Sequence, residues 1–521
     1  MARDVWPAAL LAALAIPVIL VGLGSYSVVN GDEALYHGVA QEMVDSGNWL
    51  RIEFRGEHRV YDTFVNAPLQ YWVRAALISI FGSNYWTMRI LSALFGIATV
   101  LTSYRLALYL ADRRAAFLAG LVLLTTFHFV FIHSARTGEL ETLVAFFITL
   151  SAYLFLRGLE EGRGFISHHL CLIALLNLKS PLVLLPLITE LVVFAVLPVY
   201  RAHFARWARS AALVLPLGLV WHVGNALALW DPFREVTDVV LGQAFAGPHW
   251  SARLAWNARY YGSTLLFAAF PYVLVYPLAI AGVFRAAAPG QERRRWLVVG
   301  LFAATVAVFF LALEKQLRHY IIPLYPFLSV FVGGWLARLS GRRLGPIGAL
   351  YLGLAGAALL AMDVRLTTFN PFATRSFELP LGVRWRSPPG LGAAAGVALS
   401  GALGAALLIG LARWQASRRA LPTLIAAALL GVGLVRVAMP LRHLGHQTEM
   451  ALLRERLDEA RRVGEPIAFP IEIAESGPWR ALFYFGRDFR VVAKGRRTAR
   501  RTGVSFELYE KEPLTTPPEP R

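Results

Sequence analysis

Two kinds of residue are scarce in this sequence. Only one of its 521 residues is a cysteine, Cys171, which lies in an apolar run. A single thiol excludes a disulfide within the chain, and it also excludes a cysteine-based zinc site or an iron–sulfur cluster. Charged residues make up 16% of the chain, against about a quarter in soluble proteins, so the composition excludes a soluble enzyme.

Apolar residues are abundant instead. They make up 57% of the chain, and the mean hydropathy is +0.53. Runs such as residues 176–197 are long enough to cross roughly 30 Å of hydrocarbon. We therefore predict a polytopic α-helical membrane protein with about thirteen transmembrane helices, the first of them retained rather than removed as a signal peptide. The predicted spans are 8–28, 86–111, 115–132, 140–156, 166–178, 181–199, 211–230, 261–284, 296–313, 320–336, 345–362, 391–411 and 421–437.

The excess of basic residues follows the predicted topology. Lys and Arg number 51 against 33 Asp and Glu, a net charge of +18. Every second loop between spans carries arginine, so the positive-inside rule places the N-terminus in the cytoplasm. An odd number of spans then places the C-terminus outside. The positive charge is thus explained by orientation and by attraction to anionic membrane lipids, and we predict no nucleic-acid partner.

Two long loops and a tail lie on the predicted outer side. The loops are residues 29–85, which include a predicted interfacial helix over 68–81, and residues 231–260. We predict a transmembrane domain over 1–439 and a soluble C-terminal α/β domain with a disordered tail over 440–521. Its predicted elements are a helix over 447–463 and strands over 466–473, 481–492 and 504–509.

The densest group of ionisable residues follows the first span. Asp32 and Glu33 are adjacent acids at the predicted outer membrane surface. At least one carboxylate there suits a general base or a metal ligand, although both also suit the capped first turn of a helix. The histidines show no dependable metal-ligand spacing, so a divalent metal is neither established nor excluded.

A second acidic group lies at the outer turn between the third and fourth spans. Arg136, Glu139 and Glu141 occur there, and the two acids stand at a helix start, where the helix dipole alone would favour them. On the predicted topology this turn lies on the same side as Asp32. The alternative to simple capping is an acidic site lined by more than one helix.

A third group combines cations, a histidine and a tyrosine. Lys315, Arg318, His319 and Tyr320 precede the tenth span, and Lys179 precedes the sixth. Such residues above a hydrocarbon slab suit a lipid phosphate. The alternatives are side chains that snorkel to the membrane surface and, for Lys179, a helix cap.

Together these segments carry a resemblance to a known class. The strings are Gly31-Asp32-Glu33 through Asn48-Trp49, Asn66-Ala67-Pro68-Leu69-Gln70-Tyr71-Trp72, Ala135-Arg136-Thr137 with Glu139 and Glu141, and His319-Tyr320 through Tyr325-Pro326. They resemble the GT-C class of membrane glycosyltransferases, and within it the protein O-mannosyltransferase-like and aminoarabinose (lipid A) transferase-like families. The resemblance implies about thirteen spans and an outer-facing site. It also implies transfer of a sugar from a polyprenyl-phosphate carrier to a lipid, glycan or protein acceptor at the bacterial inner membrane.

The resemblance also implies roles for individual residues. Asp32 corresponds to the family's catalytic acid and is expected to act as general base. Glu141 matches the family's second acid, with Glu139 as its rival. Contact with the carrier phosphate is expected from Tyr320 with Arg318 or His319, aided by Lys179 or Lys315. Further site candidates are Glu33, Tyr36, Arg51 and Arg136.

The chain departs from the aminoarabinose-transferase pattern at two places. Leu35 stands where that family has arginine, and 65–67 reads Val-Asn-Ala where the family has Glu-Lys-Pro. These departures favour another sugar or acceptor, or a relative that binds lipid without turnover. The rival from a different class is a transporter or flippase of a lipid-linked substrate. That class is expected to show inverted repeats and ionisable residues near mid-bilayer, and neither is evident from the sequence.

Overall fold

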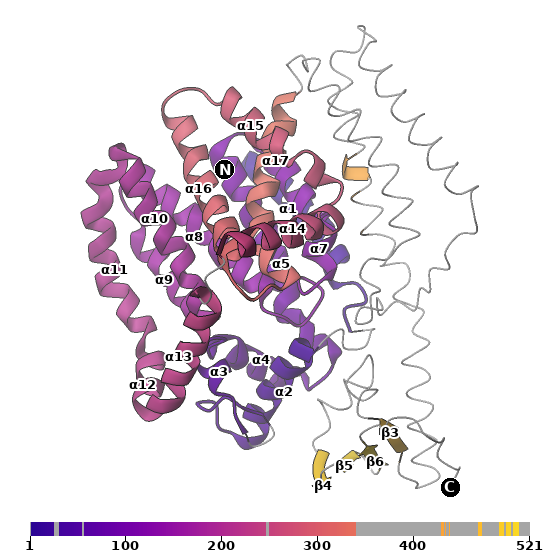
Figure 1. Cartoon of the computed structure of the whole chain (residues 1–521). Helices are drawn as coiled ribbons and strands as arrows, with labels where there is room; N and C mark the ends of the chain where they lie inside the picture. Colours follow the sequence, from indigo (N-terminus) through magenta and orange to yellow (C-terminus); the bar gives the residue numbers. More distant parts are fainter. Residues whose placement is uncertain are drawn as a thin grey trace, which may run out of the picture.

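The computed structural model describes residues 2–24, 31–54, 57–245 and 250–339, five helical positions between 429 and 437, and four strands between 467 and 509. The helices form a bundle that carries a smaller group, α2, α3 and α4, at one end (Figure 1). The α-helices are α1 (Ala2–Leu20), α2 (Gly31–Ser46), α3 (Val60–Phe64), α4 (Leu69–Phe81), α5 (Tyr85–Leu110), α6 (Arg113–Leu124), α7 (Phe127–Phe131), α8 (Glu141–Glu161), α9 (Phe165–Leu176), α10 (Leu184–Val196), α11 (Phe204–Gly218), α12 (Val220–Ala228), α13 (Trp230–Phe245), α14 (Trp250–Ala268), α15 (Tyr276–Ala286), α16 (Gln291–Ala312) and α17 (Tyr325–Leu339). The 3-10 helices are η1 (Ser180–Val183), η2 (Pro198–His203), η3 (Tyr272–Leu274) and η4 (Arg318–Leu324), and the strands are β1 (Glu53–Phe54), β2 (Glu57–His58), β3 (Ile467–Pro470), β4 (Phe489–Ala493), β5 (Arg496–Arg501) and β6 (Val504–Tyr509).

Membrane-spanning helices are fewer in the described residues than the sequence predicts. Four are long and apolar enough to cross a bilayer: Tyr85–Leu110, Glu141–Glu161, Gln291–Ala312 and Arg318–Arg338. A fifth is obtained if the pair Ser180–Val196 and Pro198–Gly218, bent by 116°, counts as one span. The chain is therefore a polytopic helical membrane protein. The predicted spans 345–362 and 391–411, and most of 421–437, lie outside the described residues.

Several predicted spans are interrupted in the structure. The predicted span 115–132 divides into α6 and α7 at Thr125 and Thr126. The hydroxyls of these two residues donate back to the carbonyls of Leu121 and Val122, at 2.6 and 2.7 Å. The predicted span 261–284 divides at Pro271, which has no N–H to donate.

The core of the bundle is built by α5, α6, α8 and α17. The last two turns of α17 approach α6 so closely that a Cβ on Gly333 would lie 2.5 Å from the Ala115 carbonyl oxygen and the Ala119 nitrogen. Glycine and alanine at such crossings let two helix backbones pack in direct contact, which is the usual way that membrane helices associate. Local signals set the helix ends: Asn84 caps α5 in a reciprocal pair with Thr87.

The predicted outer loop 29–85 is mostly helical. The helix expected over 68–81 is confirmed as α4, its interfacial position stays a prediction, and the buried Arg74 ties it to α5. The Arg74 guanidinium donates to the Met88 carbonyl at 2.5 Å and to the Ser92 hydroxyl at 3.4 Å. Much of the second predicted loop, 231–260, is also helical, as α13 and the first half of α14.

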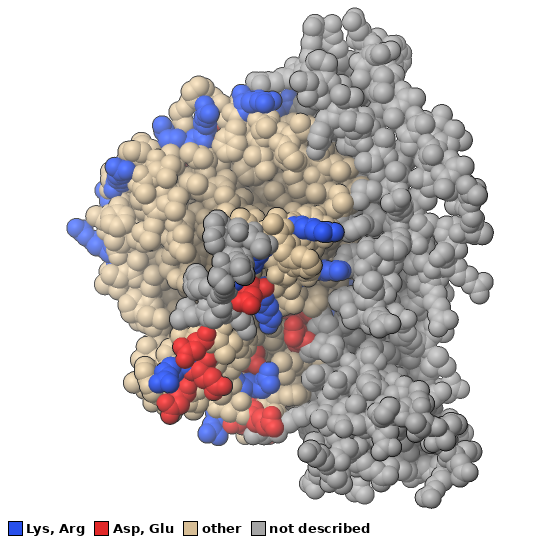
Figure 2. Space-filling view, viewed as in Figure 1, with Lys and Arg blue, Asp and Glu red and all other residues tan. Residues whose placement is uncertain are grey.

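Charged side chains are unevenly distributed over the bundle. On the face drawn in Figure 2, the Asp and Glu side chains gather toward the end where Figure 1 places α2, α3 and α4. At the opposite end of this face the charged side chains are Lys and Arg. This separation agrees with the basic and acidic sides inferred from the sequence.

The C-terminal strands form one mixed sheet in the order β3-β6-β5-β4. The β3–β6 pair is parallel, and the other two pairs are antiparallel. Strands were expected near β3, β4 and β6. The strand β5, Arg496–Arg501, was missed because its sequence RRTARR lacks the apolar alternation that marks a strand. The helix expected over 447–463 lies outside the described residues, and the soluble α/β domain over 440–521 remains a prediction.

Candidate functional site

The two adjacent acids at the start of α2 occupy different environments. Glu33 is completely buried, and its carboxylate accepts from the Arg89 Nε at 2.5 Å and the Arg89 Nη2 at 3.3 Å. The Gly138 amide donates to the same carboxylate at 2.9 Å, and Arg89 also donates to the Leu23 carbonyl. Glu33 therefore joins α2, α5 and the turn before α8. The sequence analysis placed Glu33 among the site candidates but did not find its partner Arg89.

Asp32, by contrast, is exposed in the first turn of α2. Its negative charge acts on groups from several other segments. After burial, it is the largest influence that raises the pKa of Tyr36, which lies one turn further along α2. It also contributes to the raised pKa of His133 and of Glu139, so Asp32 and the turn before α8 share one electrostatic environment. The hydrogen bond from the Gly138 amide to Glu33 likewise joins the start of α2 to this turn.

The turn before α8 holds a buried acid–imidazole pair. His133 Nδ1 lies 2.8 Å from Glu139 Oε2, and the Thr137 hydroxyl donates to the same oxygen at 3.2 Å. Burial would lower the pKa of His133, but the Glu139 carboxylate outweighs burial and raises it to about 9. Burial, with the negative charges of Glu141 and Asp32, raises the pKa of Glu139. At a pH between the ordinary and the raised pKa values, the pair therefore keeps protons that an isolated histidine or glutamate side chain would release.

Backbone geometry at His133 supports the importance of this turn. Its φ of 49° lies in the left-handed region, and it is the one non-glycine residue with positive φ among the described residues. A bulky residue is rarely held in this region, and such strain concentrates at functional sites. From the sequence, the histidines show no dependable metal-ligand spacing, and His319 is the one histidine expected at the site. The nearest available signal was that His133 occurs in the same outer turn as Glu139.

Glu141 joins the turn to the cations of two other segments. Its Oε1 lies 3.4 Å from the Lys179 Nζ and 3.6 Å from the His319 Nε2. His319 stacks on His133 with ring centroids 4.3 Å apart, and the Lys179 Nζ lies 5.3 Å from the centroid of the Tyr320 ring. Five predicted site residues thus converge from α8, η4 and the turns before α8 and η1: Glu139, Glu141, Lys179, His319 and Tyr320.

Tyr61 of α3 completes this group and was not predicted. Burial raises its pKa, while the charge of Lys179 opposes the rise and the charge of Asp32 adds to it. Tyr61 is 36% exposed, so its hydroxyl stands at the accessible edge of the group. We call Asp32, Tyr36, Tyr61, His133, Glu139, Glu141, Lys179, His319 and Tyr320 the acid–lysine site.

Other predicted candidates lie at its margin or outside it. Arg136 donates to the carbonyls of Val18, Ile19 and Val21, so it caps the C-terminal end of α1. Arg51 is exposed and pairs with Glu53 at 3.2 Å. The remaining two, both near the start of η4, are the exposed Lys315 and the half-buried Arg318.

Metal ligation is not indicated at the acid–lysine site. Among the described residues, the one group of three or more His, Cys, Asp or Glu side chains with converging ligand atoms is His168, His169 and Glu190, on α9 and α10.

The chain is similar to one family model and to several curated proteins. Residues 65–223 match the family model described as dolichyl-phosphate-mannose-protein mannosyltransferase. The undecaprenyl phosphate-α-4-amino-4-deoxy-L-arabinose arabinosyl transferase of Pseudomonas aeruginosa (strain UCBPP-PA14) is 26% identical over 88% of this chain and 81% of its own length. An uncharacterized protein of Aquifex aeolicus (strain VF5) is 25% identical over 70% of each chain.

Solved structures share the fold. The crystal structure of ArnT from Cupriavidus metallidurans bound to undecaprenyl phosphate superposes with a TM-score of 0.63 at 20% identity, covering 91% of this chain and 84% of that one. Its apo form gives a TM-score of 0.62 over 93% of this chain. The fold is thus that of the ArnT structures, and the family model and the curated relatives make the chain similar to membrane glycosyltransferases of the GT-C class. Within this class the chain is similar to the aminoarabinose transferases over most of its length.

Proposed function

We propose that this protein transfers a sugar from a polyprenyl-phosphate carrier to a hydroxyl of a lipid, glycan or protein on the outer face of the membrane. The relatives that match most of the chain are named for an aminoarabinose carried on undecaprenyl phosphate. The matching family model is named for a mannose carried on dolichyl phosphate. A sugar on a polyprenyl phosphate is the feature common to both names, so we assign the donor to that chemical class.

We assign the catalytic base from the difference in solvent exposure among the acids of the site. Glu139 and Glu141 are buried and lie against His133 and Lys179, whereas Asp32 is exposed. A general base must reach the proton that it removes, so Asp32 is the carboxylate in a position to accept it from an incoming hydroxyl.

The lysine of the acid–lysine site suits the leaving group. Lys179 lies beside Glu141 and over the Tyr320 ring, and its side chain is 17% exposed. An ammonium in a largely dry setting stabilises a phosphate more strongly than it would in water. We assign Lys179, with His319 and Tyr320, to the carrier phosphate, and Glu141 to holding Lys179 in place.

The proposed reaction is a single displacement. Asp32 removes the acceptor's hydroxyl proton as the oxygen forms a bond to the anomeric carbon of the sugar. The bond between that carbon and the phosphate oxygen breaks, and its electron pair goes to the phosphate. Lys179 then balances the added negative charge on the released carrier.

Two contacts support a donor or acceptor different from that of the aminoarabinose transferases. Leu35, where the family has arginine, packs against the apolar cluster between α2 and α4. Asn66, where the family has lysine, donates to the buried Asp62 at 2.7 Å. Both positions are occupied by contacts within the protein, so they supply no positive charge to a substrate.

The test is a transfer assay on the full chain in proteoliposomes. Polyprenyl phosphates carrying aminoarabinose or mannose are supplied with lipid, glycan and peptide acceptors, and both free carrier and glycosylated product are measured. Asp32→Asn is expected to lower the rate by about a hundredfold or more, the range of general base catalysis. Asp45→Asn, the same change at the exposed opposite end of α2, should leave the rate nearly unchanged.

Each outcome bears on a separate part of the proposal. Undiminished transfer by Asp32→Asn would refute the assignment of the base. Movement of labelled carrier across the bilayer without cleavage would instead establish a flippase. No cleavage of any supplied donor by wild-type protein would refute the donor class.

A further inference from the structure

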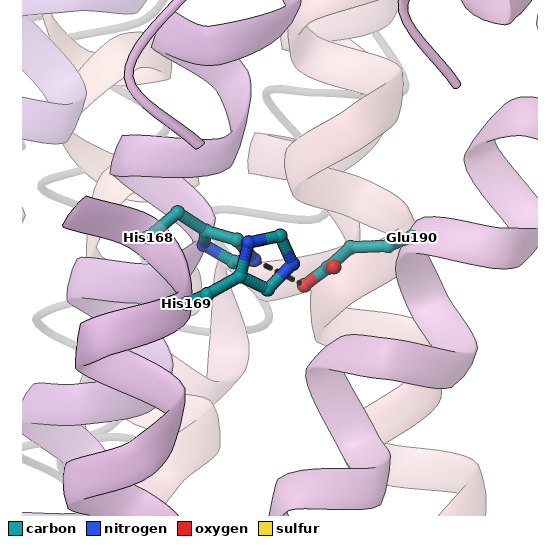
Figure 3. A group of neighbouring side chains, drawn as sticks. All are labelled: His168, His169 and Glu190. Carbon is teal, nitrogen blue, oxygen red and sulfur yellow. Dashed lines mark ion pairs between the residues drawn. The ribbon is translucent and has the colours of Figure 1, made fainter. Parts of the chain in front are cut away.

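A second group of ionisable side chains lies deep in the helix bundle. His168 and His169 on α9 and Glu190 on α10 are all fully buried. Figure 3 shows both imidazole rings directed toward the carboxylate from the neighbouring helix, with the ion pair between His168 Nε2 and Glu190 Oε1 at 3.0 Å. One ligand atom from each of the three residues lies within 4.8 Å of the other two.

The group is far from the acid–lysine site. His168 Nδ1 contacts the carbonyl of Ser151, ten residues along α8 from Glu141. At 1.5 Å per residue this corresponds to about 15 Å along the helix, or roughly half the thickness of the hydrocarbon core. Ionisable side chains at such depth are costly and are retained where they have a function. No ionisable residue near mid-bilayer is evident from the sequence, and Glu190 is an exception that the structure reveals.

The hydrogen bonds around the group leave one ring nitrogen of each histidine and one oxygen of the carboxylate directed inward. Because the Ser151 carbonyl only accepts, His168 Nδ1 must donate to it, at 3.2 Å, which leaves the Nε2 of a neutral ring as a lone pair. That lone pair faces the Glu190 carboxylate oxygen, an arrangement that is repulsive unless a cation lies between them. His169 Nδ1 is held by the Ser210 hydroxyl at 2.9 Å, and Glu190 Oε2 accepts from the Trp207 Nε1 at 2.7 Å.

A proton on His168 would provide partners for only two of the three inward-facing atoms. It would satisfy His168 and Glu190, but His169 Nε2 would still have no hydrogen-bond partner within the part of the chain that the structure describes. A metal ion satisfies all three inward atoms at once. The outer atoms of the same three side chains already have the partners that typically orient metal ligands: a carbonyl, a hydroxyl and an indole N–H.

We propose that His168, His169 and Glu190 bind a divalent transition-metal ion, of which Zn²⁺ fits best. Two imidazole nitrogens and one carboxylate oxygen form a known zinc ligand set, with ligand bonds of about 2.0–2.2 Å. Imidazole ligands favour zinc and its transition-metal neighbours over Mg²⁺ and Ca²⁺, which prefer oxygen. Such an ion neutralises the buried carboxylate and links α9 to α10, the two helices that flank Lys179.

The direct experiment measures zinc in the purified full chain in detergent. The protein is stripped with a chelator, equilibrated with ZnCl₂, dialysed and analysed for metal content. Wild type should retain one zinc per chain, whereas His169→Gln and Glu190→Gln should each bind zinc at least tenfold more weakly. His222→Gln, a change of a half-buried histidine on α12, serves as the matched control and should retain the metal.

A second measurement does not depend on the variants being folded. Zinc K-edge absorption of the loaded wild type should show two imidazole nitrogens and oxygen at about 2.0–2.2 Å. Failure of wild type to retain zinc would overturn the proposal. So would a stoichiometric zinc that persists in His169→Gln, or a spectrum without imidazole, because the ion would then lie elsewhere.

Discussion

Replacing Glu33 by Gln should destabilise the protein, whereas the equivalent change at its neighbour Asp32 should have little effect on stability. The Glu33 carboxylate has three donors within hydrogen-bonding range, two from Arg89 and the Gly138 amide, and the side chains of both Glu33 and Arg89 are 0% exposed. The amide of Gln must turn its NH₂ toward at least one of these donors, and it leaves the guanidinium buried without a counter-charge. Removing one partner of a buried ion pair costs about 3–5 kcal/mol.

The same substitution one residue earlier provides the control. Asp32 is exposed, so Asp32→Asn should change stability by no more than about 0.5 kcal/mol. Thermal unfolding of both variants in detergent, followed by tryptophan fluorescence, should therefore show a clearly lower melting temperature for Glu33→Gln alone. Adding Arg89→Leu to Glu33→Gln should recover part of the loss, because the uncompensated charge is then removed. A melting temperature for Glu33→Gln equal to that of wild type would refute the reasoning.

Three further predictions concern the acid–lysine site. Lys179→Met should lower kcat/KM for the carrier-linked sugar by about ten- to a hundredfold, which is the contribution of a charge-assisted hydrogen bond. Lys315→Met, a change of an exposed lysine, should lower kcat/KM far less. Equal effects of the two substitutions would refute the assignment of Lys179 to the carrier phosphate. The raised pKa values of His133 and Glu139 mean that the folded state binds more protons than the unfolded state between about pH 4.5 and 9. The stability from this pair is therefore present at low pH and lost as the pH rises toward 9, and the His133→Gln/Glu139→Gln double variant should show a flatter pH dependence of melting temperature. Gly138→Ala should lower the melting temperature, because its Cβ would lie 2.7 Å from a backbone carbonyl of α5; unchanged thermal unfolding would contradict this.

The apolar runs predicted helix position better than helix continuity. The runs over 86–111 and 296–313 correspond to the unbroken helices α5 and α16. The run over 115–132 is instead divided between α6 and α7 at Thr125 and Thr126, and the run over 261–284 divides at Pro271, which has no N–H to donate. Composition therefore identifies which segments can enter the membrane, but it does not determine where each helix ends.

The sequence by itself determined the class of environment and the segments that carry the chemistry. Few charges and long apolar runs required a membrane, and the acids at two outer helix starts marked the segments that meet at the acid–lysine site. These are local properties, which can be recognised in the sequence within one or two turns of helix. Cys171, the lone thiol, is buried, and its Sγ donates to the Phe147 carbonyl at 3.3 Å.

Only the tertiary structure decided which of two adjacent acids is buried. Asp32 and Glu33 differ by about 100° around α2, and nothing local indicates which of them faces the bundle. The answer depends on Arg89, 56 residues further along the chain, just as the position of Lys179 depends on Glu141, 38 residues away. A buried charge is retained only where a partner satisfies it, and that partner is provided by the packing of distant helices rather than by sequence neighbours.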